Sequence, residues 1–316
     1  MRFLASILAI CGLACASLAQ AGPPLDQRNR LFSLLTGPET VQLIAYTPSQ
    51  LDPRFEANQG KLPTSSIRAD LTALRSHFNG LVLYGYHEAC TPRIVAIAKE
   101  LEFRAVILSI WNPKSASEID GVAALARQYE ASFALAVLVG NEGITFQRYE
   151  AEDLAIAEKR LRGQLPKSVP ISTSEPLVGY QQEVVRKFGD FLCPNIHPVF
   201  DRKELAAPEA AAWARDEALK LAQATGKPVV LKETGFPHAG KDQFTPQSQL
   251  DFWQSYLKPG TLAMAGKNWA FLGVGFEAFD LPWKSQESKL EIEKSWGLFS
   301  PNREPHPALS AWRKLR

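Results

Sequence analysis

The feature that most limits the fold is an alternation of short apolar runs with longer amphipathic stretches. Eight runs have strand length, at 41–46, 80–86, 103–111, 133–141, 169–174, 191–198, 228–235 and 270–279. Helical periodicity fills six of the intervals, at 66–78, 91–102, 117–130, 151–165, 208–225 and 247–257. Because the runs are almost continuously apolar, they predict parallel strands that helices cover on the outside.

Eight strand–helix units in a chain of 316 residues predict an α/β fold of the (β/α)8 barrel type, the TIM barrel. A doubly wound open sheet is the alternative, but no glycine-rich dinucleotide or phosphate loop follows an early strand. We therefore expect a single catalytic domain over residues 22–316. In such a barrel the functional side chains lie at the carboxyl ends of the strands.

The N-terminus has the pattern of a secretory signal peptide over residues 1–21. Arg2 supplies a positive charge, an apolar stretch follows it, and residues 19–21 form a small-x-small cleavage pattern. We expect cleavage before Gly22 and export to the periplasm or the medium. Lipidation at a cysteine of this segment is the alternative, although the residues before each cysteine fit a lipidation pattern poorly. No later apolar run reaches the length of a membrane-spanning helix.

The distribution of charge limits the kinds of partner that this chain can bind. The formal net charge is +2 and no basic cluster runs along one face, so neither nucleic acid nor a membrane surface is an expected partner. A small or neutral molecule is a more suitable partner for such a chain, and we expect the chain to be a monomer.

Cys90 and Cys193 are expected to be separate buried thiols. The absence of Cys-x-x-Cys or His-x-x-x-His spacing predicts no metal and no cofactor.

Polar residues follow several of the predicted strands directly. The fourth strand ends in Asn141 and Glu142, and the seventh carries Glu233 in "LKETGFP". Taken singly, a glutamate at a strand end is usually a solvated rim residue or an ion-pair partner. Two carboxylates at one barrel mouth have the composition that glycoside cleavage requires, one to protonate the leaving oxygen and one to attack or activate water. Strand alternation predicts that Lys232 points away from the Glu233 side.

Several segments together resemble glycoside hydrolase family 17, the β-1,3-glucanase family. The two main matches are "VGNE" at 139–142 and "KETGFP" at 232–237. Further matches are "LVLYGY" at 81–86, "NIHPVF" at 195–200, "FEAFDLPWK" at 276–284, which is similar to bacterial members, and "WGLFSPNREPHPAL" at 296–309. The resemblance implies a retaining mechanism in a (β/α)8 clan.

Within that resemblance, Glu142 would be the general acid/base and Glu233 the nucleophile. Asn141 would donate to the 2-hydroxyl of the sugar at the cleavage point. The remaining substrate-binding candidates are strand-end or aromatic residues, namely Tyr84, His197, Phe236, Glu277, Trp283 and Lys284. Trp111 and Glu175 are weaker candidates of the same kind. Phe236 and His197 depart from the tryptophan and tyrosine that the family usually has there.

The predicted substrate is a β-glucan oligosaccharide or polysaccharide with β-1,3 linkages. Hydrolysis and transglycosylation share one glycosyl-enzyme, so the sequence leaves both open, as it does endo and exo action. Alternatives are a barrel of the same clan acting on another β-linkage and a barrel that binds β-glucan without cleaving it.

Overall fold

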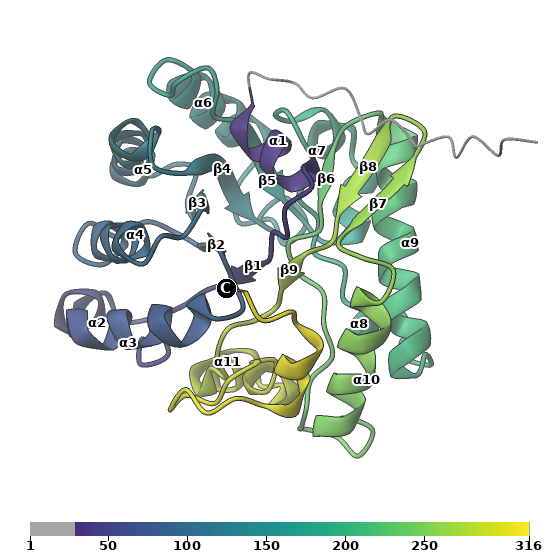
Figure 1. The fold of residues 1–316 in the computed structure, drawn as a ribbon. Coiled ribbons are helices and arrows are strands. Elements are labelled where there is room, and N and C mark those ends of the chain that lie inside the picture. The colour runs from purple at the N-terminus through teal and green to yellow at the C-terminus, as the bar shows by residue number, and fades with distance from the viewer. Residues whose placement is uncertain (1–28, 316) are drawn as a thin grey trace, which may run out of the picture.

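The predicted parallel strands form most of a closed ring in the computed structural model, which describes residues 29–315 (Figure 1). Six of them pair in the order β5-β4-β3-β2-β1-β9, and every pair is parallel. Their bounds are Leu43–Ala45 (β1), Gly80–Val82 (β2), Ala105–Ile110 (β3), Ala134–Asn141 (β4), Ile171–Ser174 (β5) and Val274–Gly275 (β9). The first five predicted runs are thus confirmed as strands.

A second sheet and an irregular segment complete the ring. This sheet contains β6 (Val229–Val230), β8 (Asn268–Phe271) and β7 (Leu262–Ala265), in that order. The chain passes from β8, which is parallel to β6, into β9, which pairs with β1. The predicted eighth strand is therefore two short strands, and their succession closes the barrel.

The predicted sixth strand is reduced to isolated bridges between β5 and β6. These bridges join Pro176 to Asn195, Leu192 to Val229 and Asn195 to Glu233. Proline has no N–H donor, so the prolines at 194 and 198 prevent a continuous ladder here. The antiparallel hairpin of β7 and β8 was not expected, because β7 contains no β-branched residue.

Helices surround the ring, with α2 to α6 on one side and α8 to α10 on the other (Figure 1). The predicted helices are confirmed as Thr64–Arg75 (α3), Thr91–Glu100 (α4), Ala116–Tyr129 (α5), Ala151–Arg162 (α6), Ala207–Thr225 (α9) and Pro246–Leu257 (α10). The shorter elements are Arg30–Thr36 (α1), Glu56–Lys61 (α2), Glu183–Lys187 (α7), Pro198–Asp201 (α8), Pro282–Ser288 (α11), Leu177–Gln181 (η1), Glu291–Lys294 (η2) and Pro307–Ala311 (η3). In residues 29–315 no helix combines the length and apolarity needed to cross a bilayer. The signal-peptide prediction lies outside these residues.

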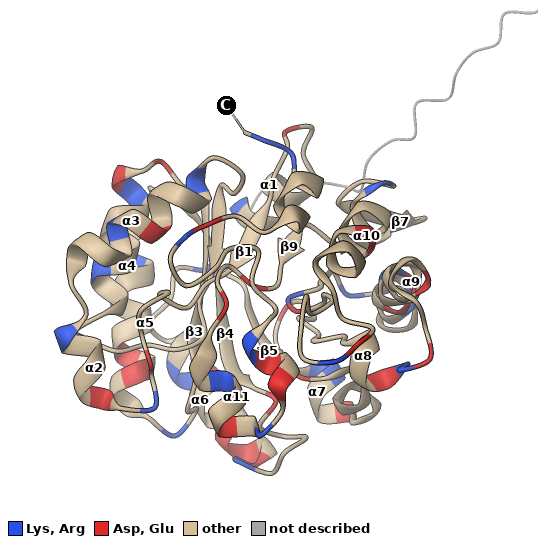
Figure 2. Cartoon of the chain, turned by 90° about the horizontal axis from the view of Figure 1, so that it is seen from below, with Lys and Arg blue, Asp and Glu red and all other residues tan. Residues whose placement is uncertain are grey.

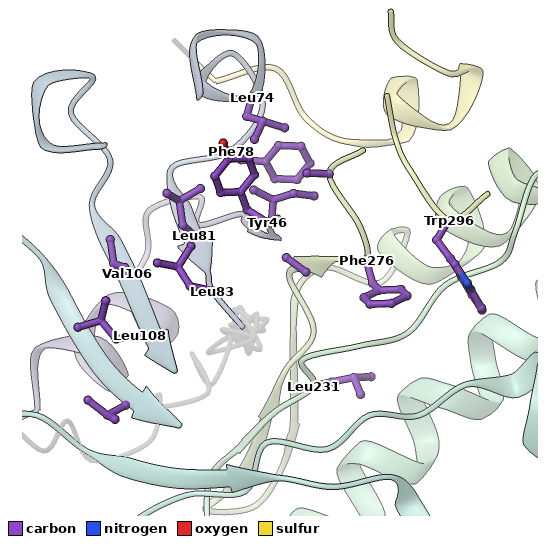
Figure 3. Packing of buried hydrophobic residues seen from close by; sticks show 14 of the residues in the cluster. Tyr46, Leu74, Phe78, Leu81, Leu83, Val106, Leu108, Leu231, Phe276 and Trp296 are labelled. Atoms are coloured by element: carbon purple, nitrogen blue, oxygen red, sulfur yellow. The ribbon is translucent and has the colours of Figure 1, made fainter. Parts of the chain in front are cut away.

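Strand alternation divides the core into two layers. Alternate residues such as Leu81, Val106 and Leu108 pack outward against the helices (Figure 3). The residues between them, such as Val82 and Ile107, belong to a smaller cluster that also contains Leu31 and Leu35 of α1, Phe191 and Cys193. Helix α1 therefore covers one end of the barrel interior, and a filled interior leaves function to the strand ends.

The cysteine prediction is confirmed, since Cys90 and Cys193 are both free and buried. Cys90 precedes α4 and packs in the outer layer, whereas Cys193 belongs to the inner cluster. Acidic and basic residues are both spread over the helices and loops in the view of Figure 2, and neither sign dominates.

Candidate active site

The end of β4 turns sharply so that Glu142 leaves the line of the strand. Gly140 and Glu142 both have left-handed backbone conformations, with φ of 77° and 57°. A glutamate rarely adopts this conformation, and such residues concentrate at functional sites. A Cβ on Gly140 or on Gly143 would overlap the ring of Tyr149. The two glycines therefore make room for the ring of this tyrosine.

The loop that follows Glu142 is held by buried polar side chains. The carboxylate of Glu175, which is 0% exposed, accepts from the backbone N–H groups of Ile144 (3.0 Å) and Thr145 (3.1 Å). The hydroxyl of Tyr149 accepts from the N–H of Gly143 at 3.1 Å. These contacts fix the backbone just after Glu142. Glu175 therefore stabilises the loop through hydrogen bonds to its backbone.

Among the described residues, Glu142 has a single side-chain donor, and another carboxylate lies nearby. Its Oε1 accepts from Nδ2 of Asn195 at 2.8 Å. Burial raises the pKa of Glu142, the negative charge of Glu233 raises it further, and the hydrogen bond from Asn195 opposes both. The net shift is upward, which favours the protonated form that a general acid needs.

Glu233 is more deeply buried, yet its surroundings favour the charged form. Nζ of Lys232 lies 2.9 Å from its Oε1, and Nε2 of His197 lies 3.3 Å from its Oε2. Burial alone would raise the pKa of Glu233, but the charge of Lys232 and the hydrogen bond from His197 outweigh it and lower the pKa below the ordinary value. The same hydrogen bond overcomes burial to raise the pKa of His197. Glu233 is therefore a carboxylate held in its ionised form.

The predicted direction of Lys232 is wrong, because its side chain turns toward Glu233. Regular pairing of β6 ends at Val230, so strict alternation no longer applies two residues later, and the long lysine stem reaches sideways. Nζ also donates to Oδ1 of Asn141 and lies 4.9 Å from the ring centre of Tyr84. Lys232 is 2% exposed and contacts residues at the carboxyl ends of β4 and β2 as well as Glu233.

Glu277 and Lys284 form a second ion pair near this pair of carboxylates. Both oxygens of Glu277 accept from Nζ of Lys284 at 2.6 Å. Burial outweighs that contact and raises the pKa of Glu277 to about 7, with a further contribution from the charge of Glu233. Both residues are thus near the predicted site, although they contact each other.

The aromatic candidates differ in their surroundings. The hydroxyl of Tyr84 is buried close to Glu233, and burial and the charge of Glu233 both raise the pKa of this tyrosine. Within residues 29–315 the buried indole N–H of Trp283 has no hydrogen-bond partner. Phe236 is only 4% exposed, and its ring packs against Phe244 and Phe252. We therefore leave Phe236 out of the residues proposed to contact substrate. Trp111, at 45% exposure, lies under the guanidinium of Arg148 at 4.6 Å.

The sequence did not point to Asn195, a residue whose side chain contacts both Glu142 and Asn141. Its Nδ2 also donates to Oδ1 of Asn141 at 3.2 Å, and its own Oδ1 accepts from Ser174 at 3.0 Å. Asn195 opens the segment "NIHPVF", so its place at the sixth strand end was the available signal. Its partners come from two other strand ends, which a linear reading does not bring together.

Two glutamates at the strand ends of a (β/α)8 barrel, one with a raised and one with a lowered pKa, are the pair of carboxyl groups that a glycoside hydrolase uses. Comparison with known proteins gives the particular family. The chain belongs to the family described as the BtgE/BtgC glycoside hydrolase domain, which matches residues 44–297.

Fungal relatives share this domain at modest identity. A probable glucan endo-1,3-beta-glucosidase (btgC) of Aspergillus flavus is 25% identical over 286 residues, covering 79% of this chain and 40% of the relative. The chain thus spans about two fifths of the btgC proteins it matches. A glucan 1,3-beta-glucosidase of Saccharomyces cerevisiae is 23% identical over 260 residues, with 75% of this chain and 82% of the relative covered.

Solved structures share the fold. A glycoside hydrolase family 17 beta-1,3-glucanosyltransferase from Rhizomucor miehei superimposes with a TM-score of 0.65 at 19% identity, covering 87% of this chain and 99% of that one. CJP38, a beta-1,3-glucanase and allergen of Cryptomeria japonica pollen, has a TM-score of 0.63 at 16% identity, with 87% and 98% covered. The family 17 resemblance read from the sequence is confirmed.

Proposed function

We propose that this chain cleaves β-1,3-linked glucan with retention of configuration, using Glu142 as acid/base and Glu233 as nucleophile. The observation that carries this assignment is the unequal environment of the two carboxylates. Glu233 contacts the ammonium group of Lys232 and the imidazole of His197, whereas Glu142 accepts from the neutral amide of Asn195. The names of the relatives, which include glucan endo-1,3-beta-glucosidases and a glucanosyltransferase, support the linkage.

In the first step, the ionised Glu233 attacks the anomeric carbon while Glu142 donates its proton to the glycosidic oxygen. The carbon–oxygen bond to the leaving sugar breaks as the bond to Glu233 forms, which yields a glycosyl-enzyme. Glu142 is then ionised and acts as the base. It removes a proton from water or from a sugar hydroxyl, and the resulting oxygen displaces Glu233.

We propose that Asn141 binds the sugar through its amide nitrogen. Its Oδ1 accepts hydrogen bonds from Lys232 and Asn195, and these donors fix which end of the amide is oxygen. In residues 29–315 its Nδ2 has no protein partner, so it is free to donate to the 2-hydroxyl at the cleavage point. Among the other predicted contacts, we retain Tyr84, His197, Glu277, Trp283 and Lys284 as the lining of the substrate site.

The test is to incubate the protein with laminarin and linear β-1,3 oligosaccharides, with β-1,4 oligosaccharides as the linkage control. Shorter products indicate hydrolysis, and products longer than the substrate indicate transfer. Activity confined to another linkage would show that the chain is an enzyme of the same clan with a different substrate. Binding without any product would show that it is a glucan-binding barrel.

Variants then separate the roles of the two carboxylates. Glu233→Ala should lose activity on all substrates by a factor of about 10⁴ or more and regain part of it with azide, which would replace the missing nucleophile. Glu142→Ala should lose much less on a dinitrophenyl glycoside, whose leaving group needs no proton. Glu209→Gln, an exposed residue of α9, is the matched control and should behave as wild type. Equal losses for both variants on the activated substrate would contradict this assignment.

We also propose that the enzyme acts as an exported monomer. The signal-peptide pattern of residues 1–21 supports the export part of the proposal. N-terminal sequencing of the protein from culture fractions would locate the cleavage site, and size-exclusion chromatography would give the oligomeric state.

A further inference from the structure

A cluster of metal-ligating side chains lies outside the proposed active site. It consists of His238, Asp280 and His306, whose ligand atoms all lie within 4.8 Å of one another. Nε2 of His238 is 3.0 Å from each oxygen of Asp280, and Nε2 of His306 is 2.8 Å from Oδ2. The two imidazole rings are 4.2 Å apart between centres. Both rings thus direct the same nitrogen at one carboxylate.

The backbone holds these three residues in place through one shared segment. The N–H groups of His238, Asp280 and His306 donate to the carbonyls of Ser295, Phe299 and Leu298, at 2.9 Å in each case. Such fixed backbones leave little freedom to lose when a ligand binds, which is the condition for a preorganised site.

A further contact orients the carboxylate. The N–H of Gly297 donates to Oδ1 of Asp280 at 3.0 Å. A side chain at position 297 would overlap the backbone of Asp280, so only glycine permits this approach. A hydrogen bond of this kind is typical of the second layer of contacts that orients metal ligands.

We propose that His238, Asp280 and His306 bind a divalent transition-metal ion of the zinc type as a structural clamp. Two imidazoles and one carboxylate are the donors that Zn²⁺ accepts, with a water molecule as the fourth ligand. Bonds of about 2.1 Å at tetrahedral angles separate ligand atoms by about 3.4 Å. The histidine–carboxylate separations of 3.0 and 2.8 Å therefore need to open by roughly half an ångström, and all the ligand atoms already lie within 4.8 Å of one another. The side chains are 12–20% exposed, which leaves a route for the ion.

The clamp would join three distant parts of the chain. His238 lies on the loop five residues after Glu233, Asp280 follows β9, and His306 belongs to the C-terminal segment. The ligands are 42 and 26 residues apart, which explains why a search for local ligand spacing predicted no metal. An ion here would tie the C-terminal segment to the two strand ends that carry Glu233 and Glu277.

The test measures metal binding directly and does not depend on glycosidase activity. The full-length mature protein is stripped with a chelator, incubated with Zn²⁺, desalted and analysed for bound zinc. We expect about one ion per chain and a rise in Tm of roughly 5 °C at a hundredfold excess of Zn²⁺ over Kd. Co²⁺ should give the visible absorption of a four-coordinate site with nitrogen ligands.

Variants locate the ion. Asp280→Asn and His306→Gln should each weaken Zn²⁺ binding by at least about 100-fold and abolish the rise in Tm. His77→Gln, a half-buried histidine after α3, is the matched control and should bind as wild type. Circular dichroism of the chelator-treated variants verifies that they fold. The Co²⁺ spectrum of the wild-type protein tests metal coordination without relying on any variant. Wild type that retains no zinc, or variants that retain as much as wild type, would overturn the site and leave a hydrogen-bonded His–Asp–His triad.

Discussion

At the scale of single residues, the neighbours of the two glutamates shift their pKa values apart. Both follow apolar runs and both lie at barrel strand ends, so without the family resemblance the sequence does not distinguish the acid from the nucleophile. The structure separates them because Lys232 and His197 contact Glu233, whereas Asn195 contacts Glu142. Their pKa values therefore move in opposite directions, and each neighbour is a means to change one carboxylate at a time.

Replacing Asn195 by alanine should move the alkaline limb of the pH profile. The variant loses the donor that lowers the pKa of Glu142, so that pKa should rise further. Because the first step needs Glu142 protonated, the alkaline limb of kcat/KM should shift to higher pH while the maximum rate falls. The measurement is kcat/KM against pH on a β-1,3 oligosaccharide.

Asn79→Ala is the control for this variant. Asn79 is also buried and hydrogen-bonded, to Gln42 and Thr40, but it precedes β2 at the amino end of the barrel. It should lose stability and keep the wild-type pH profile. A limb that stays in place or moves downward in Asn195→Ala would refute the proposed link to Glu142.

Replacing Lys232 by methionine should move the opposite limb. The cation next to Glu233 holds that pKa down, so its removal should raise the pKa of Glu233. Since the nucleophile must be ionised, the acidic limb of kcat/KM should shift to higher pH, and activity should fall most at low pH. Lys227→Met is the control, because Nζ of Lys227 binds backbone carbonyls at the opposite end of β6. If both lysine variants shift the limb equally, Lys232 does not act through Glu233.

At the scale of elements, the strand ends and the loop after β4 decide what the sequence can and cannot predict. Runs long enough to show a period, such as those of β3, β4 and α9, were predicted correctly because pattern and burial agree over many residues. The sixth strand and the β7–β8 hairpin were not, because their pairing depends on partners elsewhere in the chain. Contacts with distant parts of the chain also explain why the sequence did not point to Asn195 and predicted the wrong direction for Lys232. Local motifs, in contrast, were enough to select Glu142 and Glu233 as candidates.

Replacing Glu175 by glutamine should loosen the loop that carries Glu142. The carboxylate accepts from two backbone N–H groups, and an amide keeps only one acceptor and turns an NH₂ toward the other. The lost contact is worth about 1 to 2 kcal/mol, so kcat should fall about tenfold if the loop must hold Glu142 in place.

Kinetics on a β-1,3 oligosaccharide, with hydrogen exchange over residues 142–149, would show whether the loop has loosened. Asp190→Asn is the control, since Asp190 accepts from the N–H of Ile171 at the amino end of β5. It should change stability without changing kcat. Unchanged exchange in Glu175→Gln together with lower kcat would point to a direct role of Glu175 instead.

At the scale of the whole molecule, the C-terminal segment fastens the first part of the barrel to the last. Arg303 donates through Nε to Oδ1 of Asp70 at 2.7 Å, and Asp70, in α3, is 0% exposed. The same carboxylate accepts from Tyr46 and Ser49 next to β1. The proposed metal clamp fastens this segment at a second point, through His306.

Replacing Arg303 by methionine should therefore destabilise the entire barrel and not only its C-terminus. The change leaves a buried carboxylate without its cation, which should cost about 2 to 3 kcal/mol because Arg303 is a quarter exposed. Tm should fall by about 5 °C or more. Adding Asp70→Asn removes the charge that needs compensation, so the double variant should be more stable than Arg303→Met alone. Thermal unfolding of the two single variants and the double variant would give this coupling, and additive losses would show that the ion pair does not close the barrel.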